Sequence, residues 1–184
     1  MAKINSNILW ITRTAIFIAL LIVFQVVTKP FGQYVTGSSV NLLLMTATLT
    51  CGIYSGLTIA LVSPFFAFLL GIGPAFIQFV PFIALGNMVF VLIGYLLSDK
   101  NLYKKSLKGY IFSTMGIVIA AVAKFLLLWL GIVKIIVPIM NQLKEQQIAA
   151  FTAAFSLPQL VTALIGGLIA IPLAAIIRKA IFKR

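Results

Sequence analysis

The feature of the sequence that most constrains the fold is residues 111–131, an apolar run that contains a single charged residue, Lys124. Its length matches the roughly 20 residues that a helix needs to cross the bilayer core. A lysine inside such a run costs roughly 3 kcal/mol unless acceptors or water meet its ammonium group, so it indicates a functional site. The alternative is that its long side chain reaches the nearer membrane surface. Along a helix, Lys124 lies about 10 Å from Gly131. Because this distance is long for the side chain to reach the surface, we favour a functional or a buried, paired lysine.

The rest of the composition has the same membrane character. Of the 184 residues, 62% are hydrophobic and 9% are charged, which indicates a polytopic integral membrane protein. The net charge is +12, but the basic residues flank apolar runs. The positive-inside rule therefore explains them, and we expect no nucleic-acid partner.

Several functions are excluded by residues that the chain lacks. It has no histidine, one cysteine (Cys51) and two carboxylates, Asp99 and Glu145, which both fall in polar connections. A metal cluster, a Ser-His-Asp triad and an intramembrane proton relay therefore cannot be assembled. The phosphate-binding motif G-x-x-x-x-G-K-[ST] does not occur either. We expect a protein that is not an enzyme and needs no metal or cofactor, so that partners must supply the energy for any active transport.

The apolar runs and their breaks predict an all-α integral membrane protein with a single domain over residues 1–184. Gly52 and Gly56 divide a long apolar stretch, Pro64 should kink the next helix without ending it, and Gly71 to Pro74 should form a tight turn. The six predicted transmembrane helices are residues 8–27, 41–54, 56–73, 75–97, 109–131 and 155–177. The longer connections are a Pro/Gly/Ser-rich loop at 28–40, a lysine-rich loop at 98–108 and a partly amphipathic segment at 133–147.

The distribution of basic residues predicts the orientation, because six spans place both termini on one side. Ten basic residues fall on that side: Lys3, Arg13, Lys100, Lys104, Lys105, Lys108, Arg178, Lys179, Lys183 and Arg184. Three fall on the other side: Lys29, Lys134 and Lys144. This excess predicts that both termini are cytoplasmic and that the protein lies in the plasma membrane. The loops at 28–40 and 133–147 then face outwards, where we expect a binding site and its lids.

Seven residues are candidate ligand contacts on the outward side: Lys124, Gln159, Gln78, Asn87, Tyr34, Asn41 and Trp129. Gln159 shares a polar, small-residue helix face with Thr162 and Gly166, so it contacts either a ligand or a neighbouring helix. Gln78 and Asn87 are nine residues apart and should point in opposite directions on a helix. Depth favours Gln78 for an outer site, and helix–helix hydrogen bonding is the alternative role for Asn87.

The last three candidates depend on the loops and the helix ends. Tyr34 and Asn41 reach the site if the first loop closes over it as a lid. Trp129 has the ring needed to stack on a ligand, but an aromatic residue near a helix end also fits the interfacial belt.

The first predicted helix contains Ala15-Ile-Phe-Ile-Ala19, a small-x-x-x-small pair that lets another helix approach closely. With this motif, its small size, its six spans and its long outward loops, the chain resembles the substrate-binding S components of energy-coupling factor (ECF) vitamin transporters over nearly its whole length. In that family an A-x-x-x-A motif docks on the shared energy-coupling transmembrane subunit, so the resemblance assigns this role to Ala15 and Ala19. It implies a non-catalytic subunit that binds a micronutrient from outside, with two ATPases driving its uptake.

The charge of Lys124 also predicts the kind of ligand. A buried ammonium group needs an anion or several acceptors, so we expect a small vitamin-like compound such as pantothenate or a folate rather than cationic thiamine. Two other classes of protein stay open. A stand-alone facilitator or small channel needs a continuous polar pathway, and a structural membrane assembly protein needs no pocket.

Overall fold

The structure is a computed structural model that describes residues 6–73, 75–98 and 107–182, and these residues form helices joined by short turns. In chain order the elements are α1 (Ser6–Thr28), η1 (Lys29–Phe31), α2 (Gln33–Cys51), α3 (Ile53–Leu69), η2 (Ile77–Phe79), α4 (Val80–Leu97), α5 (Leu107–Leu128), η4 (Trp129–Ile136), α6 (Val137–Ile139), α7 (Glu145–Ala154) and α8 (Leu157–Phe182). The element η4 is π-helical and continues α5. Most of the predicted lysine-rich loop lies outside the described residues, as do Lys3, Lys183 and Arg184.

The helices make this chain a multi-pass membrane protein. Four helical segments of the described residues are long and apolar enough to cross a membrane: Ser6–Phe31, Ile77–Leu97, Leu107–Ile139 and Glu145–Ala180. α3 is a shorter apolar helix. α2 is less apolar but packs against α1, α3, α4 and α8, and eight of its 19 residues are buried. The hydroxyl groups of its buried Thr46 and Thr48 therefore face protein rather than lipid. The count of six spans with cytoplasmic termini stays a prediction.

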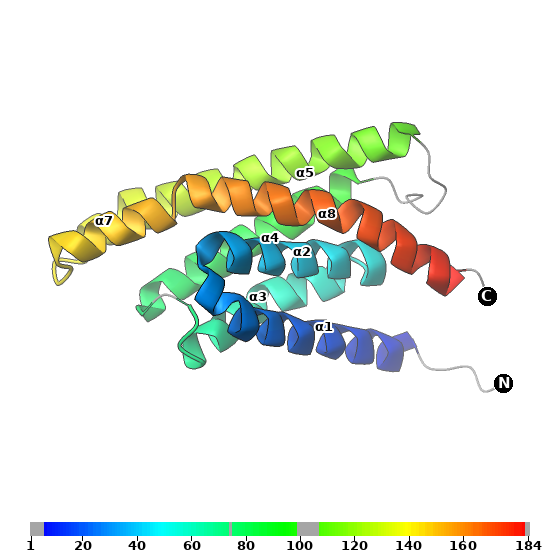
Figure 1. Cartoon of the computed structure of the whole chain (residues 1–184), viewed down its shortest axis with the longest axis horizontal. Helices are drawn as coiled ribbons and strands as arrows, with labels where there is room; N and C mark the ends of the chain where they lie inside the picture. Colours follow the sequence, from blue (N-terminus) through cyan, green and yellow to red (C-terminus); the bar gives the residue numbers. More distant parts are fainter. Residues whose placement is uncertain (1–5, 74, 99–106, 183–184) are drawn as a thin grey trace.

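The helices form an elongated bundle in which α1 begins and α8 ends at the same end (Figure 1). α7 lies at the opposite end, where the α1–α2 and α3–α4 connections also lie. We call this the α7 end. A large apolar cluster that includes Leu44, Phe90 and Ile117 fills the bundle, and a second cluster around Phe79 and Phe155 lies under α7. The connections that the sequence placed on the outward side thus meet at one end of the molecule.

The prediction of a loop over residues 28–40 is wrong from Gln33 onwards, where α2 begins. The chain reverses in a short turn that ends at Gly32, whose φ of 82° favours glycine. The small residues that follow serve helix packing instead. A Cβ on Gly166 of α8 would lie 2.4 Å from the Ser38 carbonyl oxygen of α2. Glycine and serine allow these two backbones to touch, and this is the reason why they do not mark a loop here.

The connection predicted at 133–147 is also largely helical. η4 extends to Ile136, and α7 then begins at Glu145. The Gln147 side chain accepts a hydrogen bond from the Lys144 backbone N–H at 3.0 Å, which satisfies one of the free donors at the start of α7. The segment before α8 therefore folds as a short helix.

The predicted break between the second and third helices is present. α2 ends at Cys51 and α3 begins at Ile53, and each of these boundaries lies three residues earlier than predicted. Gly52 lies between the two helices with a φ of 98°. α3 continues through Pro64, as expected. The predicted turn is seen at Gly71, with a φ of 65°, whereas Pro74 lies outside the described residues.

Candidate ligand-binding site

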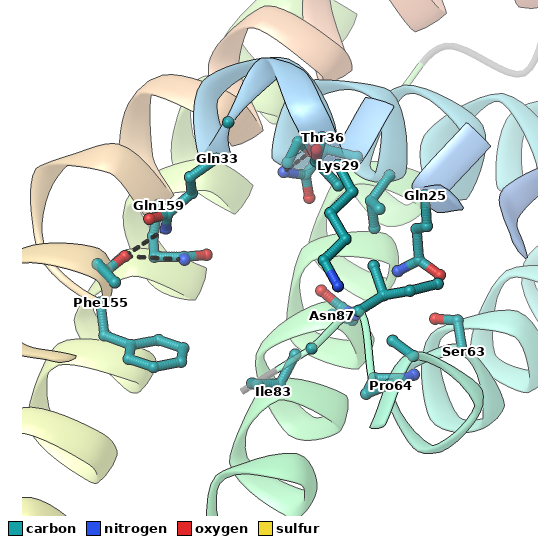
Figure 2. Close-up of a pocket in the computed structure, with 18 of the residues that line it drawn as sticks. Gln25, Lys29, Gln33, Thr36, Ser63, Pro64, Ile83, Asn87, Phe155 and Gln159 are labelled. Atoms are coloured by element: carbon teal, nitrogen blue, oxygen red, sulfur yellow. Dashed lines mark hydrogen bonds between the residues drawn. The ribbon is translucent and has the colours of Figure 1, made fainter. Parts of the chain in front are cut away.

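A cavity of about 380 Å³ opens at the α7 end of the bundle (Figure 2). This volume is typical of a small-molecule site. Its polar lining residues are Gln25, Lys29, Gln33, Thr36, Asn41, Ser63, Asn87, Lys124 and Gln159. Its apolar lining includes Val40, Pro64, Ala67, Ile72, Ile83, Phe151 and Phe155. No acidic side chain occurs among the described residues that line it, so the cavity is cationic.

Three buried side chains from three helices form the part that we call the floor: Asn41 of α2, Asn87 of α4 and Lys124 of α5. Lys124 is 3% exposed, so its side chain does not reach a membrane surface. Its Nζ donates to Asn41 Oδ1 at 2.6 Å and to Asn87 Oδ1 at 2.7 Å, and it lies 5.5 Å from the centroid of the Phe90 ring. Both acceptors are neutral amides, so the floor holds a buried positive charge without an anionic partner.

Three side chains at the mouth form the part that we call the rim: Lys29, Gln33 and Gln159. Lys29 Nζ donates to the Gly71 carbonyl oxygen at 2.7 Å and so joins the α1–α2 turn to the α3–α4 turn. Gln33 Nε2 and Gln159 Nε2 both donate to the Ala154 carbonyl oxygen, at 2.6 and 3.1 Å. These two bonds fix the end of α7 to α2 and α8. Hydrogen bonds to backbone carbonyl groups therefore hold the rim residues in place around the mouth.

Three further lining residues contain buried oxygens that pair with nothing in the described part of the chain: Gln25 Oε1, Thr36 Oγ1 and Ser63 Oγ. A buried polar atom without a hydrogen bond costs roughly 1–3 kcal/mol. Water or a polar ligand in the cavity would supply the missing partners. The cavity thus has the character of a site for a polar compound rather than of a packing defect.

Aromatic side chains build the wall below α7. The Phe79 ring lies edge-to-face against Phe151 and Phe155, with centroid distances of 4.8 and 5.7 Å, and Phe76 extends the cluster. Such edge-to-face pairs contribute roughly 0.5–1.5 kcal/mol each beyond the area that they bury. Phe151 and Phe155 also line the cavity. The cluster therefore holds α7 in place and gives the cavity an apolar, ring-bearing side.

The structure brings together four of the seven candidate ligand contacts, since Lys124, Asn41, Asn87 and Gln159 all line the cavity. Asn41 does so from a helix rather than from a lid, because α2 begins before it. The side chains of Gln159 and Asn87 also bond to protein, which is one of the two roles that the sequence left open for each. Ligand contact by these residues stays a prediction.

The other three candidates lie away from the cavity lining. Gln78 lies in η2 and is exposed, whereas Asn87 lies in α4 and is buried. Tyr34 is 55% exposed. The ring of Trp129 has Lys134 Nζ above it, 4.9 Å from its centroid. None of the three is among the residues that line the described cavity.

Sequence reasoning missed several residues of the site. Gln25 is an amide within the first apolar run, and Ser63 directly precedes a proline within the third. Both are polar side chains in membrane-spanning sequence, the same signal that identified Lys124. Lys29 was counted for topology alone, and Phe151 gave no signal because aromatic residues are common throughout this chain.

Ala15 and Ala19 lie on the exposed side of α1, next to exposed apolar residues such as Ile16 and Val23. α1 is also the least buried of the four candidate spans, with 17% of its window buried. A small-residue pair on an exposed apolar helix is available to lipid or to a partner helix. The docking role of this pair stays a prediction.

The chain matches the model of a known family. The model of the family described as "ECF transporter, substrate-specific component" matches residues 10–178, a range that contains every residue of the floor and the rim. Neither a curated protein nor a solved structure matches the chain.

Proposed function

Since the chain belongs to the family of ECF transporter substrate-specific components, we propose that it binds a vitamin or related micronutrient in the cavity and delivers it to an energy-coupling module. In this proposal the module is a transmembrane coupling subunit with two ATPases, and together they form an ABC importer. The chain described here is the subunit that selects the substrate. The α7 end faces outwards, and both termini are cytoplasmic.

The observation that carries the proposal is the buried charge at the floor. Lys124 lies beside a cavity of about 380 Å³ with two neutral amides as partners. Burying a charge without an opposite charge is unfavourable. A transporter subunit that needed Lys124 for structure alone could use an apolar side chain at this position. A lysine in this place is explained if an incoming ligand completes its environment.

The charges of the lining favour an anionic or acceptor-rich ligand. Lys29 and Lys124 both line the cavity, and no acidic side chain does so among the described residues. A carboxylate would therefore gain two attractive interactions, whereas a cation would meet repulsion. Pantothenate and folate have this character, and thiamine does not.

The α1 surface supports the second half of the proposal, which is docking. Ala15 and Ala19 are exposed on α1, and Gln25 of the same helix lines the cavity. One helix thus connects the proposed docking surface to the binding site. We propose that the coupling subunit packs against this Ala15–Ala19 surface.

A thermal-shift screen of the detergent-purified chain against a vitamin panel tests the binding. A ligand present at about 100 times its dissociation constant adds roughly 2.7 kcal/mol to the free energy of unfolding. We expect one acidic vitamin to raise the unfolding midpoint, and uptake into liposomes to require the coupling module. Uptake by the chain alone would show a facilitator instead, and no shift across the panel would count against a binding subunit.

Co-purification with a co-expressed energy-coupling module tests the docking. We expect Ala15→Trp and Ala19→Trp to abolish co-purification, because a large side chain prevents close helix approach. Both variants should still bind the vitamin. Val118→Trp is the matched control, since Val118 is an exposed apolar residue of α5. If all three variants co-purify equally, the partner surface lies elsewhere.

A further inference from the structure

We infer that the ligand is an organic acid that also carries an O–H or N–H donor at the end remote from its carboxylate. The inference rests on the proposed function, since it names the class of compound that the same cavity takes. It follows from the directions in which the amide groups of the floor and the rim are fixed by their bonds to protein.

The floor has hydrogen-bond donors that no described protein group accepts. Lys124 has three N–H donors and no acceptor, and two of the three are used by Asn41 and Asn87. Asn41 is fully engaged, because its Nδ2 donates to the Gly37 carbonyl oxygen at 2.9 Å. Asn87 has a free donor, because its Oδ1 accepts from Lys124 but its Nδ2 bonds to no residue that the structure describes. The floor can therefore donate from Lys124 and from Asn87, which fits a carboxylate.

On the side of α7, the rim has hydrogen-bond acceptors that no described protein group uses. Gln33 and Gln159 both direct Nε2 to the Ala154 carbonyl oxygen. Because an amide group is planar, this bond turns each Oε1 away from Ala154. Neither Oε1 accepts a hydrogen bond from any described residue. A ligand group that covers these two oxygens and displaces their water must donate an N–H or an O–H in its place.

The free donors of the floor and the free acceptors of the rim lie on different sides of the cavity. Figure 2 shows Gln33, Gln159 and Phe155 on one side and Lys29 and Asn87 on the other. Lys124 belongs to the second side through its bond to Asn87. Phe155 adds an apolar ring to the acceptor side. A bound acid is thus oriented with its carboxylate at the floor and its donor group beside Gln159, near the aromatic wall.

This arrangement discriminates against two simpler kinds of anion. A fatty acid satisfies the floor but places a hydrocarbon chain against two amide oxygens. Inorganic phosphate satisfies the floor but has no remote end that could place a donor beside Gln33 and Gln159. A site that hydrogen-bonds a polar group of its ligand binds analogues without that group more weakly.

Isothermal titration with defined probes tests the inference. Pantothenate, biotin and folate are acids with a donor far from the carboxylate. Their methyl esters lack the anion, and octanoate is an acid without such a donor. We expect the chain to bind at least one of the three vitamins, with its methyl ester and octanoate each at least about 10-fold weaker.

Binding of octanoate separates the acceptor from the bond to Ala154. Gln159→Met removes both the acceptor and that bond without adding charge. We expect Gln159→Met to weaken binding of that vitamin about 10-fold and to leave binding of octanoate unchanged. Gln33→Met provides a second variant at an exposed position if Gln159→Met does not fold.

The outcomes separate this inference from the proposed function. Octanoate binding as tightly as the best vitamin, or unchanged vitamin binding in both Met variants, overturns the remote donor and leaves an anion-binding subunit in place. Equal losses of vitamin and octanoate binding in Gln159→Met overturn it too, because the bond to Ala154 then explains the effect. Binding by none of the probes overturns the proposed class of ligand and this inference with it.

Discussion

The floor and the rim of the cavity are both held by amide and ammonium hydrogen bonds, but their surroundings differ. At the floor, Lys124 bonds to the buried side chains of Asn41 and Asn87, and the bonds join three helices. At the rim, exposed Lys29 and Gln33 bond to backbone carbonyl groups near the ends of helices. A hydrogen bond to a charged group is stronger in a buried site than at a wet surface. The floor is therefore expected to set affinity, and the rim to set the rates of entry and exit.

The largest expected effect comes from Lys124→Met, which removes the charge of the floor and keeps most of its volume. Binding of an acidic vitamin should weaken about 100-fold, because a hydrogen bond to a charged group contributes roughly 1.5–3 kcal/mol. Titration calorimetry gives this ratio directly. The ligand-free protein should keep nearly the same unfolding midpoint, because the variant loses two hydrogen bonds but also a buried charge. A large fall in that midpoint, with affinity unchanged, would mean that Lys124 is a structural residue.

An intermediate effect is expected from Asn87→Asp, which places an anion beside Lys124 in nearly the same volume. The new carboxylate should pair with the ammonium group and raise the unfolding midpoint of the ligand-free protein. It should also weaken binding of an acid about 10-fold, because the ligand then competes with a protein anion. Asn87→Leu is the control, since it removes the amide without adding charge. If Asn87→Asp binds acids as well as the wild type does, the ligand does not use the charge at the floor.

The floor was largely predictable from the sequence because its signal is local. A lysine or an amide in an apolar run has few ways to be stable in a membrane, and each of them requires a partner inside the protein. Lys124 and Asn87 were found in this way, whereas Asn41 was predicted as a residue of the first loop. Gln25 and Ser63 carry the same signal in weaker form, because short neutral side chains also bond within their own helix.

Of the rim, Gln159 alone was predicted, because the rim depends on how distant connections meet. Gln33 and Gln159 converge on one carbonyl group although they lie 121 and 5 residues from Ala154. No pattern within a single segment encodes such a meeting point. The error at residues 28–40 has a related cause, since Gly37 appears as a loop residue until α8 is known to pack against it.

The smallest expected effect, and the sharpest test of the comparison, comes from Lys29→Met at the rim. Loss of the bond from Lys29 to the Gly71 carbonyl group should weaken affinity only about 3-fold, because exposed polar contacts contribute roughly 0.2–1 kcal/mol. Stopped-flow measurements should show faster dissociation, as one connection across the mouth is lost. They should also show slower association at low salt, with the difference disappearing at high salt as the charge is screened. Lys29→Arg, which keeps the charge and a donor, should behave like the wild type. If Lys29→Met weakens binding as much as Lys124→Met does, the carboxylate is bound at the mouth, and the rim rather than the floor sets the affinity.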